Sequence, residues 1–161
     1  MSEGYILCKQ RKASKGQILS VILLIAAIAM FFVDSETILS KFLFLFIALI
    51  IVGTSVYYKI TSEFDNKKIY MVFGIPILKI KLDVVYPDYI SIAPGKFKSD
   101  NEYSSVAALG TEEKYDMFAL RFFKDNKNDK VYMSSSYEDV LEKAQWLSNV
   151  LKTEIYDATK N

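Results

Sequence analysis

Two long stretches without a charged side chain constrain this chain more than any other feature. Residues 17–33 and 42–58 each run for 17 residues without Asp, Glu, Lys or Arg. A helix that is apolar on every face lies either in a large core or in lipid, and the rest of this chain is too short to enclose two such helices. With their flanks, both stretches are long enough for a hydrocarbon core about 30 Å thick. We therefore expect two transmembrane helices, at about 17–33 and 38–58.

Basic residues precede the first stretch and follow the second. The connecting residues 34–37 contain no Lys or Arg. Because cationic segments stay in the cytoplasm, we expect a multi-pass protein of the cytoplasmic (inner) membrane with both termini in the cytoplasm. The same cations are candidate contacts for anionic lipid at the membrane surface. They are Lys9, Arg11, Lys12 and Lys15 before the first stretch and Lys59 after the second.

The composition of the two stretches favours an anchor. A cleavable signal peptide is the alternative for the first stretch, but Phe31, Phe32 and Val33 leave no small-residue cleavage site at its end. Neither stretch contains an ionisable residue, whereas transport paths need polar groups at depth. Lys41 lies between the stretches and is expected to extend its ammonium group outward while its stem stays in lipid.

Several chemistries are excluded by residue content. The chain has no histidine, which removes Ser-His-Asp and Cys-His catalysis and most zinc sites. Residues 60–161 hold 14 Lys and Arg against 16 Asp and Glu, so the basic surface that nucleic acid requires is missing. The single cysteine, Cys8, is expected to be a free thiol in a reducing compartment; a lipidated cysteine is the alternative, but no apolar segment precedes it. We expect no cofactor, no metal and no enzymatic activity.

From residue 60 onward the hydrophobic pattern alternates, which predicts β-strands. Gly74 and Pro76 are expected to interrupt the first strands, and residues 125–129 have the composition of a hairpin turn. Residues 96–114 are not assigned, with one candidate strand at 104–109. Strands are predicted at residues 69–73, 78–82, 89–93, 117–123 and 131–133.

The hydrophobic period changes again near the C-terminus and predicts one amphipathic helix at about residues 137–152. Either Ser135 with Glu138 or Ser136 with Asp139 can cap its start. Trp146 lies at the edge of the apolar stripe as a packing residue, with ligand stacking as the alternative. The stripe consists of Val140, Leu141, Ala144, Leu147 and Leu151.

Strands followed by a helix that opens at Tyr137-Glu138-Asp139, with Ala144 and Leu147 on its apolar face, resemble the pleckstrin-homology-like (PH-like) domains of small bacterial membrane proteins. The resemblance implies an α+β chain: a transmembrane helical hairpin followed by a PH-like antiparallel β-barrel or sandwich that one C-terminal amphipathic helix closes. Its divisions would be a basic cytoplasmic tail at 1–16, two transmembrane helices at 17–58 and a cytoplasmic PH-like domain at 59–161.

The resulting hypothesis is a membrane-anchored, non-catalytic interaction module that binds a protein partner or the membrane surface. An accessory or assembly subunit that acts through its transmembrane hairpin is the alternative, and an enzyme is a third. Acidic residues such as Glu112, Glu113 and Asp116 lie in loop-like sequence without the companions that a catalytic motif needs. Four lysines on the first strands are candidate weak headgroup contacts, although acidic residues surround them: Lys67, Lys68, Lys79 and Lys81.

Overall fold

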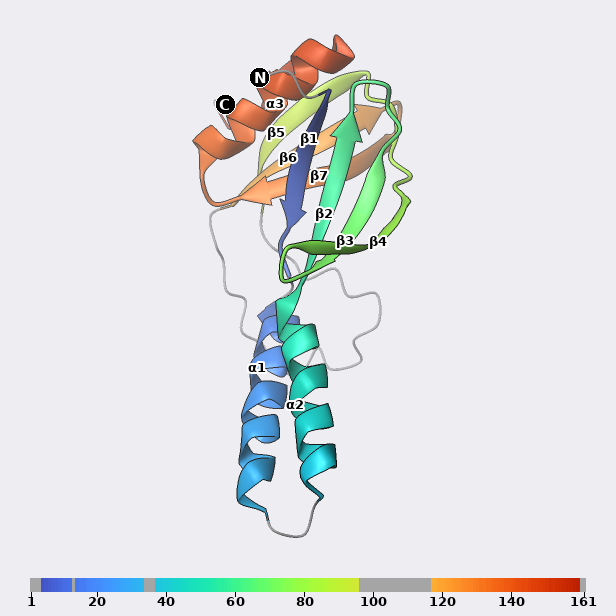
Figure 1. Cartoon of the computed structure of the whole chain (residues 1–161). Helices are drawn as coiled ribbons and strands as arrows, with labels where there is room; N and C mark the ends of the chain where they lie inside the picture. The colour runs from blue at the N-terminus through green and yellow to red at the C-terminus, as the bar shows by residue number, and fades with distance from the viewer. Residues whose placement is uncertain (1–3, 13, 34–36, 96–116, 160–161) are drawn as a thin grey trace.

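The computed structural model describes residues 4–12, 14–33, 37–95 and 117–159. It contains a domain of strands and one helix, and two further helices that project from one end of this domain (Figure 1). The elements in chain order are β1 (Tyr5–Gln10), α1 (Ser14–Ala29), the short 3-10 helix η1 (Met30–Phe32), α2 (Ile38–Gly53), β2 (Thr54–Thr61), β3 (Lys67–Val72), β4 (Ile75–Lys81), β5 (Tyr89–Gly95), β6 (Met117–Lys124), β7 (Lys127–Ser134), α3 (Tyr137–Leu151) and β8 (Glu154–Asp157).

The strands form two four-stranded sheets, in the orders β1-β2-β3-β4 and β7-β6-β5-β8. All neighbours are antiparallel except β8, which runs parallel to β5. The side-chain amide of Gln10 donates to the backbone oxygen of Val131 at 2.8 Å and so connects β1 to β7. The α+β class is therefore confirmed. The described strands make two separate sheets, and they do not close into one barrel.

Helix α3 packs its apolar stripe into the core, as its period predicts. Ser136 is the N-cap, and its hydroxyl oxygen accepts from the backbone N–H of Asp139 at 3.2 Å, which confirms the second of the two predicted caps. Fully burying a Val or Leu side chain, as at Val140 and Leu147, contributes about 1.5–3 kcal/mol. The core combines this stripe with residues of both sheets: Cys8, Ile60, Ile90, Ile92, Leu120, Phe122, Val131, Val140, Ala144, Leu147 and Leu151.

Helices α1 and α2 lie side by side below the domain (Figure 1). Ala27 and Ala48 are buried between them, and the rings of Phe31 and Phe42 meet edge to face with centroids 5.4 Å apart. Lys41 is also buried, and its Nζ donates to the Val33 carbonyl. Within the described residues, one helical stretch, Lys15–Phe32, is long and apolar enough to cross a membrane by length and composition, whereas α2 is shorter.

The N-terminal tail and the end of the second apolar stretch differ from the sequence-based expectation. Residues 5–10 are not a separate tail, because β1 pairs with β2 from Tyr5 opposite Thr61 to Gln10 opposite Val56. The second helix ends at Gly53 and not at residue 58, since Thr54 begins β2. Uncharged, β-branched and aromatic side chains suit a half-buried strand as well as a lipid-facing helix, so composition alone misplaced this boundary. The domain accordingly comprises β1 as well as the described residues from Thr54 onward.

The other predicted strands correspond to β3 to β7, with shifted ends. The break between β3 and β4 is a turn at Phe73 and Gly74, both with positive φ. Pro76 lies within β4 and not between strands; β4 is at the edge of its sheet, where a missing N–H is tolerated. The predicted turn at 125–129 is shorter than expected, because β7 already begins at Lys127. The candidate strand at 104–109 lies outside the described residues.

Candidate functional site

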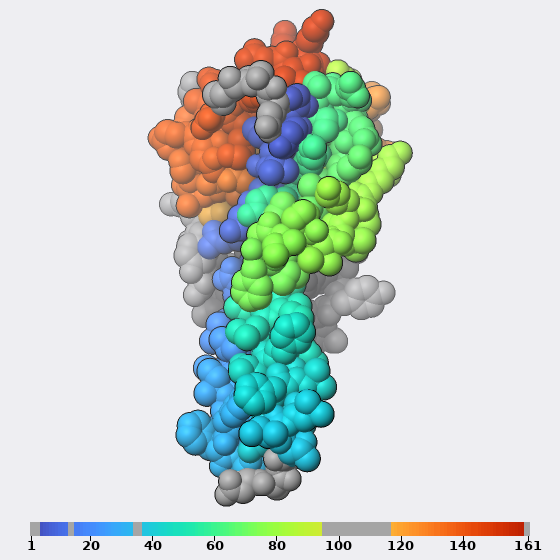
Figure 2. Space-filling view, viewed as in Figure 1, coloured from blue at the N-terminus to red at the C-terminus, as the bar shows by residue number. Residues whose placement is uncertain are grey.

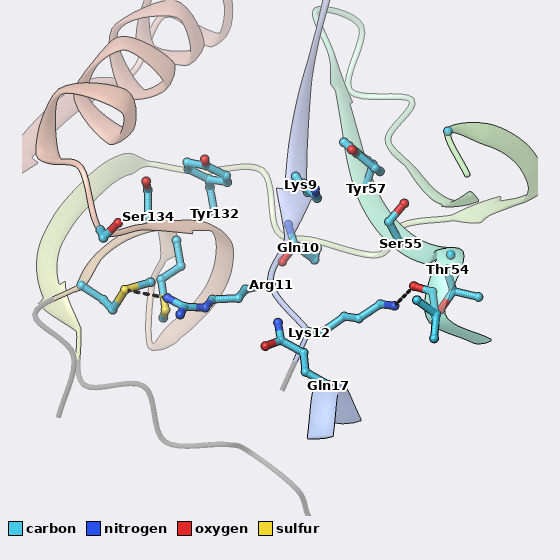
Figure 3. A pocket seen from close by; sticks show the side chains of 16 residues that line it. Lys9, Gln10, Arg11, Lys12, Gln17, Thr54, Ser55, Tyr57, Tyr132 and Ser134 are labelled. Atoms are coloured by element: carbon cyan, nitrogen blue, oxygen red, sulfur yellow. Dashed lines mark hydrogen bonds between the residues drawn. The ribbon is translucent and has the colours of Figure 1, made fainter. Parts of the chain in front are cut away.

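A groove of about 620 Å³ lies at the base of the domain, where the two sheets approach the first turn of α1 and the last turn of α2 (Figure 3). Four parts of the chain form it: the β1–α1 connection, the α2–β2 junction, the β3–β4 turn at Gly74, and the ends of β6 and β7. Its lining residues are Lys9, Gln10, Arg11, Lys12, Gln17, Val52, Gly53, Thr54, Ser55, Tyr57, Gly74, Met117, Tyr132, Met133, Ser134 and Ser135.

The groove is cationic. Lys9, Arg11 and Lys12 line it, and none of the described lining residues is Asp or Glu. Arg11 extends across the groove and donates from Nη1 to the thioether sulfur of Met117 at 3.2 Å, whereas Lys12 extends the opposite way (Figure 3). Thioether sulfur is a weak acceptor. The site therefore combines positive charge with a guanidinium group that contacts the Met117 thioether.

Lys12 has a structural partner in α2. Its Nζ donates to the backbone oxygens of Ile51 and Val52 at 3.3 and 3.0 Å. The last carbonyls of a helix lack partners within the helix and carry the negative end of its dipole, so a cation is favourable there. Lys12 thus compensates the end of α2.

An apolar turn adjoins the groove. Phe73, Ile75 and Ile77 of the β3–β4 turn and β4 are 65%, 63% and 66% exposed, while Gly74 at the tip of this turn lines the groove. Figure 2 shows the yellow-green atoms of β4 directly above the cyan atoms of α2. Exposed apolar side chains therefore continue from the helices onto the adjacent edge of the domain.

Of the predicted surface cations, the structure brings three together, namely Lys9, Arg11 and Lys12. Lys15 is exposed in the first turn of α1 and does not line the groove. Lys59 was expected beside the membrane. It lies instead on β2, at a distance of roughly 17 Å along the strand from Thr54, at about 3.4 Å per residue. Its Nζ stands 3.8 Å from the centroid of the Tyr5 ring.

The four lysines predicted as weak headgroup contacts lie on β3 and β4, away from the groove. Lys67 pairs with Lys59 and Lys81 in the sheet register, at the end of the sheet opposite the helices, and forms an ion pair of 2.8 Å with Asp65. Lys68 stacks over the Tyr70 ring, and hydrogen bonding with Tyr70 raises the pKa of Lys68. Lys79 is on the exposed edge strand. None of these four side chains lines the groove.

Behind the groove, Tyr132 belongs to a hydrogen-bonded cluster with α3. Its hydroxyl donates to Asp139, which also accepts from Lys143. Burial, followed by the hydrogen bond with Asp139, raises the pKa of Tyr132 to about 12. Burial would also raise the pKa of Asp139, but the hydrogen bonds from Lys143 and Tyr132 outweigh it, so this pKa lies below its ordinary value.

Cys8 is fully buried beside this cluster, and burial raises the pKa of its thiol to about 12. Such a thiol is protonated at neutral pH and is a poor nucleophile. Among the described residues, no group of three or more His, Cys, Asp or Glu side chains could hold a metal ion. The acidic residues Glu112, Glu113 and Asp116 lie outside the described residues.

Sequence patterns did not identify the uncharged residues of the groove. Gln10, Tyr132 and Ser134 line it together with the predicted cations, yet they carry no motif. The nearest signal in the sequence was the cluster of cations. Such a cluster is explained equally well by the orientation of a membrane helix and by the binding of an anion. Neither the scan against protein-family models nor the search of curated proteins finds a match to this chain.

Proposed function

We propose that this chain is a membrane-anchored, non-catalytic binding module that presents a PH-like domain at the cytoplasmic face of the bilayer. The observation that carries the proposal is the pairing of β1 with β2 over six residues although α1 and α2 lie between them in sequence. Paired strands lie on the same side of a membrane. The two intervening helices therefore both cross it or both stay on one side.

The exposed surface of the helices favours crossing. Many apolar side chains of α1 and α2 are more than half exposed, among them Ile18, Ile25, Leu39 and Phe46 at 60%, 61%, 76% and 61%. Water-exposed helices carry polar side chains on their outer face, whereas lipid-exposed helices are apolar all round. Bilayer hydrocarbon is the solvent that matches this surface.

The helix lengths are compatible with a thin or locally compressed bilayer. The 16 residues of α1 and 3 of η1 rise about 28 Å, and the 16 residues of α2 rise about 24 Å, at 1.5 Å per residue. A hydrocarbon core of about 30 Å exceeds the second value by a few ångström, which membranes accommodate at modest cost. The apolar β3–β4 turn beside the end of α2 adds hydrophobic surface at this boundary.

The strand pairing also argues against a cleavable signal peptide. Cleavage after the first apolar stretch would remove β1, and with it Cys8 from the core and Gln10 from its bond to Val131. Two four-stranded sheets with a helix near the C-terminus support the PH-like resemblance.

Cysteine accessibility in intact cells tests this proposal. Thr37→Cys places a thiol at the start of α2, and Glu63→Cys places one in the exposed β2–β3 turn of the domain. A membrane-impermeant maleimide should label the first variant in intact cells and the second only after lysis. The wild-type chain, with Cys8 buried, measures the background.

Carbonate extraction provides the second measurement, and the chain should stay in the membrane fraction. Labelling of the Glu63→Cys variant in intact cells would reverse the proposed orientation. Release of the chain by carbonate would exclude the anchor.

A further inference from the structure

We infer that the turn between β3 and β4 inserts into the cytoplasmic leaflet of the bilayer, as a third membrane contact beside α1 and α2. This inference rests on the proposed function, because the helices must hold the domain at the membrane. The inserting surface consists of Phe73, Gly74, Ile75 and Ile77. Its partner is the boundary between lipid headgroups and acyl chains.

The turn lies at the level of the last turn of α2. Thr54, the first residue of β2, pairs with Val72, so the turn extends past the junction of strand and helix on the side of the helix. The backbone N–H of Phe73 donates to the Gly53 oxygen at 2.9 Å, and the Phe73 ring lies against Gly53. Figure 2 shows the atoms of β4 adjoining those of α2. A lipid that contacts the end of α2 therefore also contacts this turn.

The length of α2 brings the hydrocarbon boundary to the same level. The 16 residues of α2 rise about 24 Å, a few ångström less than a hydrocarbon core of about 30 Å. The connection before α2 contains Asp34 and Glu36, whose charges are costly in hydrocarbon. The apolar layer is therefore expected to reach the Gly53 end of α2, which is the end that the turn contacts.

The turn is apolar where a hairpin turn in water is polar. Residues 69–78 contain no Asp, Glu, Lys or Arg. Phe73 and Gly74 form a two-residue turn with positive φ at both positions, 49° and 83°. Gly, Asn and Asp favour such positions, whereas a bulky side chain is strained there. Because the Phe73 side chain is largely exposed, burial inside the domain does not offset this strain. Burial in lipid does.

The nearest cations limit the depth of insertion. The Lys12 Nζ donates to the backbone oxygens of Ile51 and Val52, so a positive charge lies at the end of α2. Lys79 is the first charged residue of β4, roughly 14 Å along the strand from Ile75 at about 3.4 Å per residue. These positions suit the depth of interfacial segments, about 5–10 Å, and leave Lys79 outside the apolar layer.

A second copy of the chain fits this surface less well than lipid does. β4 is an edge strand that runs away from the helices, since it is antiparallel to β3 and β3 is antiparallel to β2. Two copies in one membrane are related by an axis normal to the bilayer, which would place their β4 strands parallel. Parallel pairing is the less common arrangement, and Pro76 lacks an N–H for it.

The test is tryptophan fluorescence of the full chain in phosphatidylcholine vesicles whose acyl chains carry bromine, either near the headgroup or at mid-chain. Bromine quenches a tryptophan that it contacts. All variants carry Trp146→Phe, which removes the single native tryptophan. Ile75→Trp reports on the turn. Ile77→Trp repeats the measurement at a second exposed position, so that misfolding of one variant does not remove the test.

Two further variants are the controls. Ile80→Trp lies on the same strand, at its far end, and is also exposed. Phe46→Trp lies on the exposed surface of α2 and reports on the anchor alone. Circular dichroism of each variant verifies the fold.

We expect the emission of Ile75→Trp and Ile77→Trp to shift to the blue on reconstitution and to be mostly lost with bromine near the headgroup. Ile80→Trp should keep its emission. Equal quenching of Ile75→Trp and Ile80→Trp would overturn the inference, because the whole strand would then lie on the bilayer. A blue shift without quenching would also overturn it, since protein, such as a second copy, would then cover the turn.

Failure of this inference is distinguishable from failure of the proposed function. Phe46→Trp should lose most of its emission with bromine at mid-chain. If it does so while both turn variants keep their emission unshifted, the inserted turn is refuted and the anchor is retained. Phe46→Trp without quenching would refute the anchor itself.

Discussion

The ring of Phe73 occupies the space that a side chain on Gly53 would need. A Cβ built on Gly53 would stand 2.6 Å from Cζ of Phe73, and the backbone N–H of Phe73 donates to the Gly53 oxygen at 2.9 Å. This contact joins the last residue of α2 to the turn between β3 and β4. It fixes the apolar turn beside the helix end, which is where the groove and the proposed bilayer surface meet.

Gly53→Ala should therefore destabilise the folded chain. The added methyl group must displace the Phe73 ring, and overpacking of this kind typically costs about 1–3 kcal/mol. Thermal unfolding of the detergent-solubilised chain, followed by circular dichroism, should show a lower melting temperature than the wild type.

Gly16→Ala is the matched control for this substitution. No atom lies within 4 Å of a Cβ at Gly16, so the change should be neutral or slightly stabilising in the helix. In addition, Phe73→Ala should remove most of the penalty of Gly53→Ala, because the clashing ring is then absent. Equal melting temperatures for both glycine variants would contradict the close approach.

Cys8 should resist alkylation in the folded chain. Its thiol is fully buried, and a pKa of about 12 against an ordinary value of 9.0 leaves roughly a thousandfold less thiolate at neutral pH. Maleimide labelling of the detergent-solubilised wild type, followed by mass spectrometry, should be slow in buffer and complete in denaturant. Rapid labelling of the folded chain would show that β1 detaches readily from the core.

How far the sequence predicts this structure depends on how local each signal is. The alternation in β3 and β6 and the stripe of α3 from Val140 to Leu151 depend on neighbouring residues, and these elements were found. The pairing of β1 with β2 was missed, because the two strands meet only after the chain has passed through both apolar helices. The groove was missed for the same reason: Arg11 meets Met117 across 106 positions of sequence.

Asp139→Asn should destabilise the domain in a pH-dependent manner. Asp139 accepts from Tyr132 and Lys143, and its pKa is lowered in the folded state. A carboxyl group with a lowered folded pKa stabilises the fold above its unfolded pKa, near 3.8, and loses this contribution as pH falls through the folded pKa. Hydrogen bonds to charged groups contribute about 1.5–3 kcal/mol, so the variant should melt lower at pH 7.

The difference in melting temperature between the wild type and the Asp139→Asn variant should narrow as pH falls from about 3.8 towards the lowered pKa of the folded state, because the carboxyl of the unfolded chain is protonated first. Melting curves at pH 7, 5 and 3 measure this change. The variant Glu142→Gln, on the same helix with an exposed side chain, is the control and should follow the wild type at each pH. A gap of constant size down to pH 3 would show that the charge of Asp139 does not stabilise the fold.

The domain should fold without α1 and α2 if β1 and β2 are joined directly. Gln10 lies opposite Val56, so a short turn containing Asn-Gly can replace residues 11–55 and keep the register. The shortened chain retains every member of the core, from Cys8 to Leu151. It should be soluble and monomeric, with a cooperative thermal transition and a circular dichroism spectrum of strands with one helix.

Residues 60–161 alone are the informative comparison, since they lack β1 and most of β2. Without these strands β3 loses its inner neighbour, and the core loses Cys8 and the contacts that Ile6 and Tyr58 make with it. We expect this fragment to aggregate or to unfold without cooperativity. A well-folded fragment would show that the second sheet and α3 form a sufficient core on their own. If the chain with joined β1 and β2 failed to fold, α1 and α2 would be part of the folding unit, and their role as a separable anchor would be wrong.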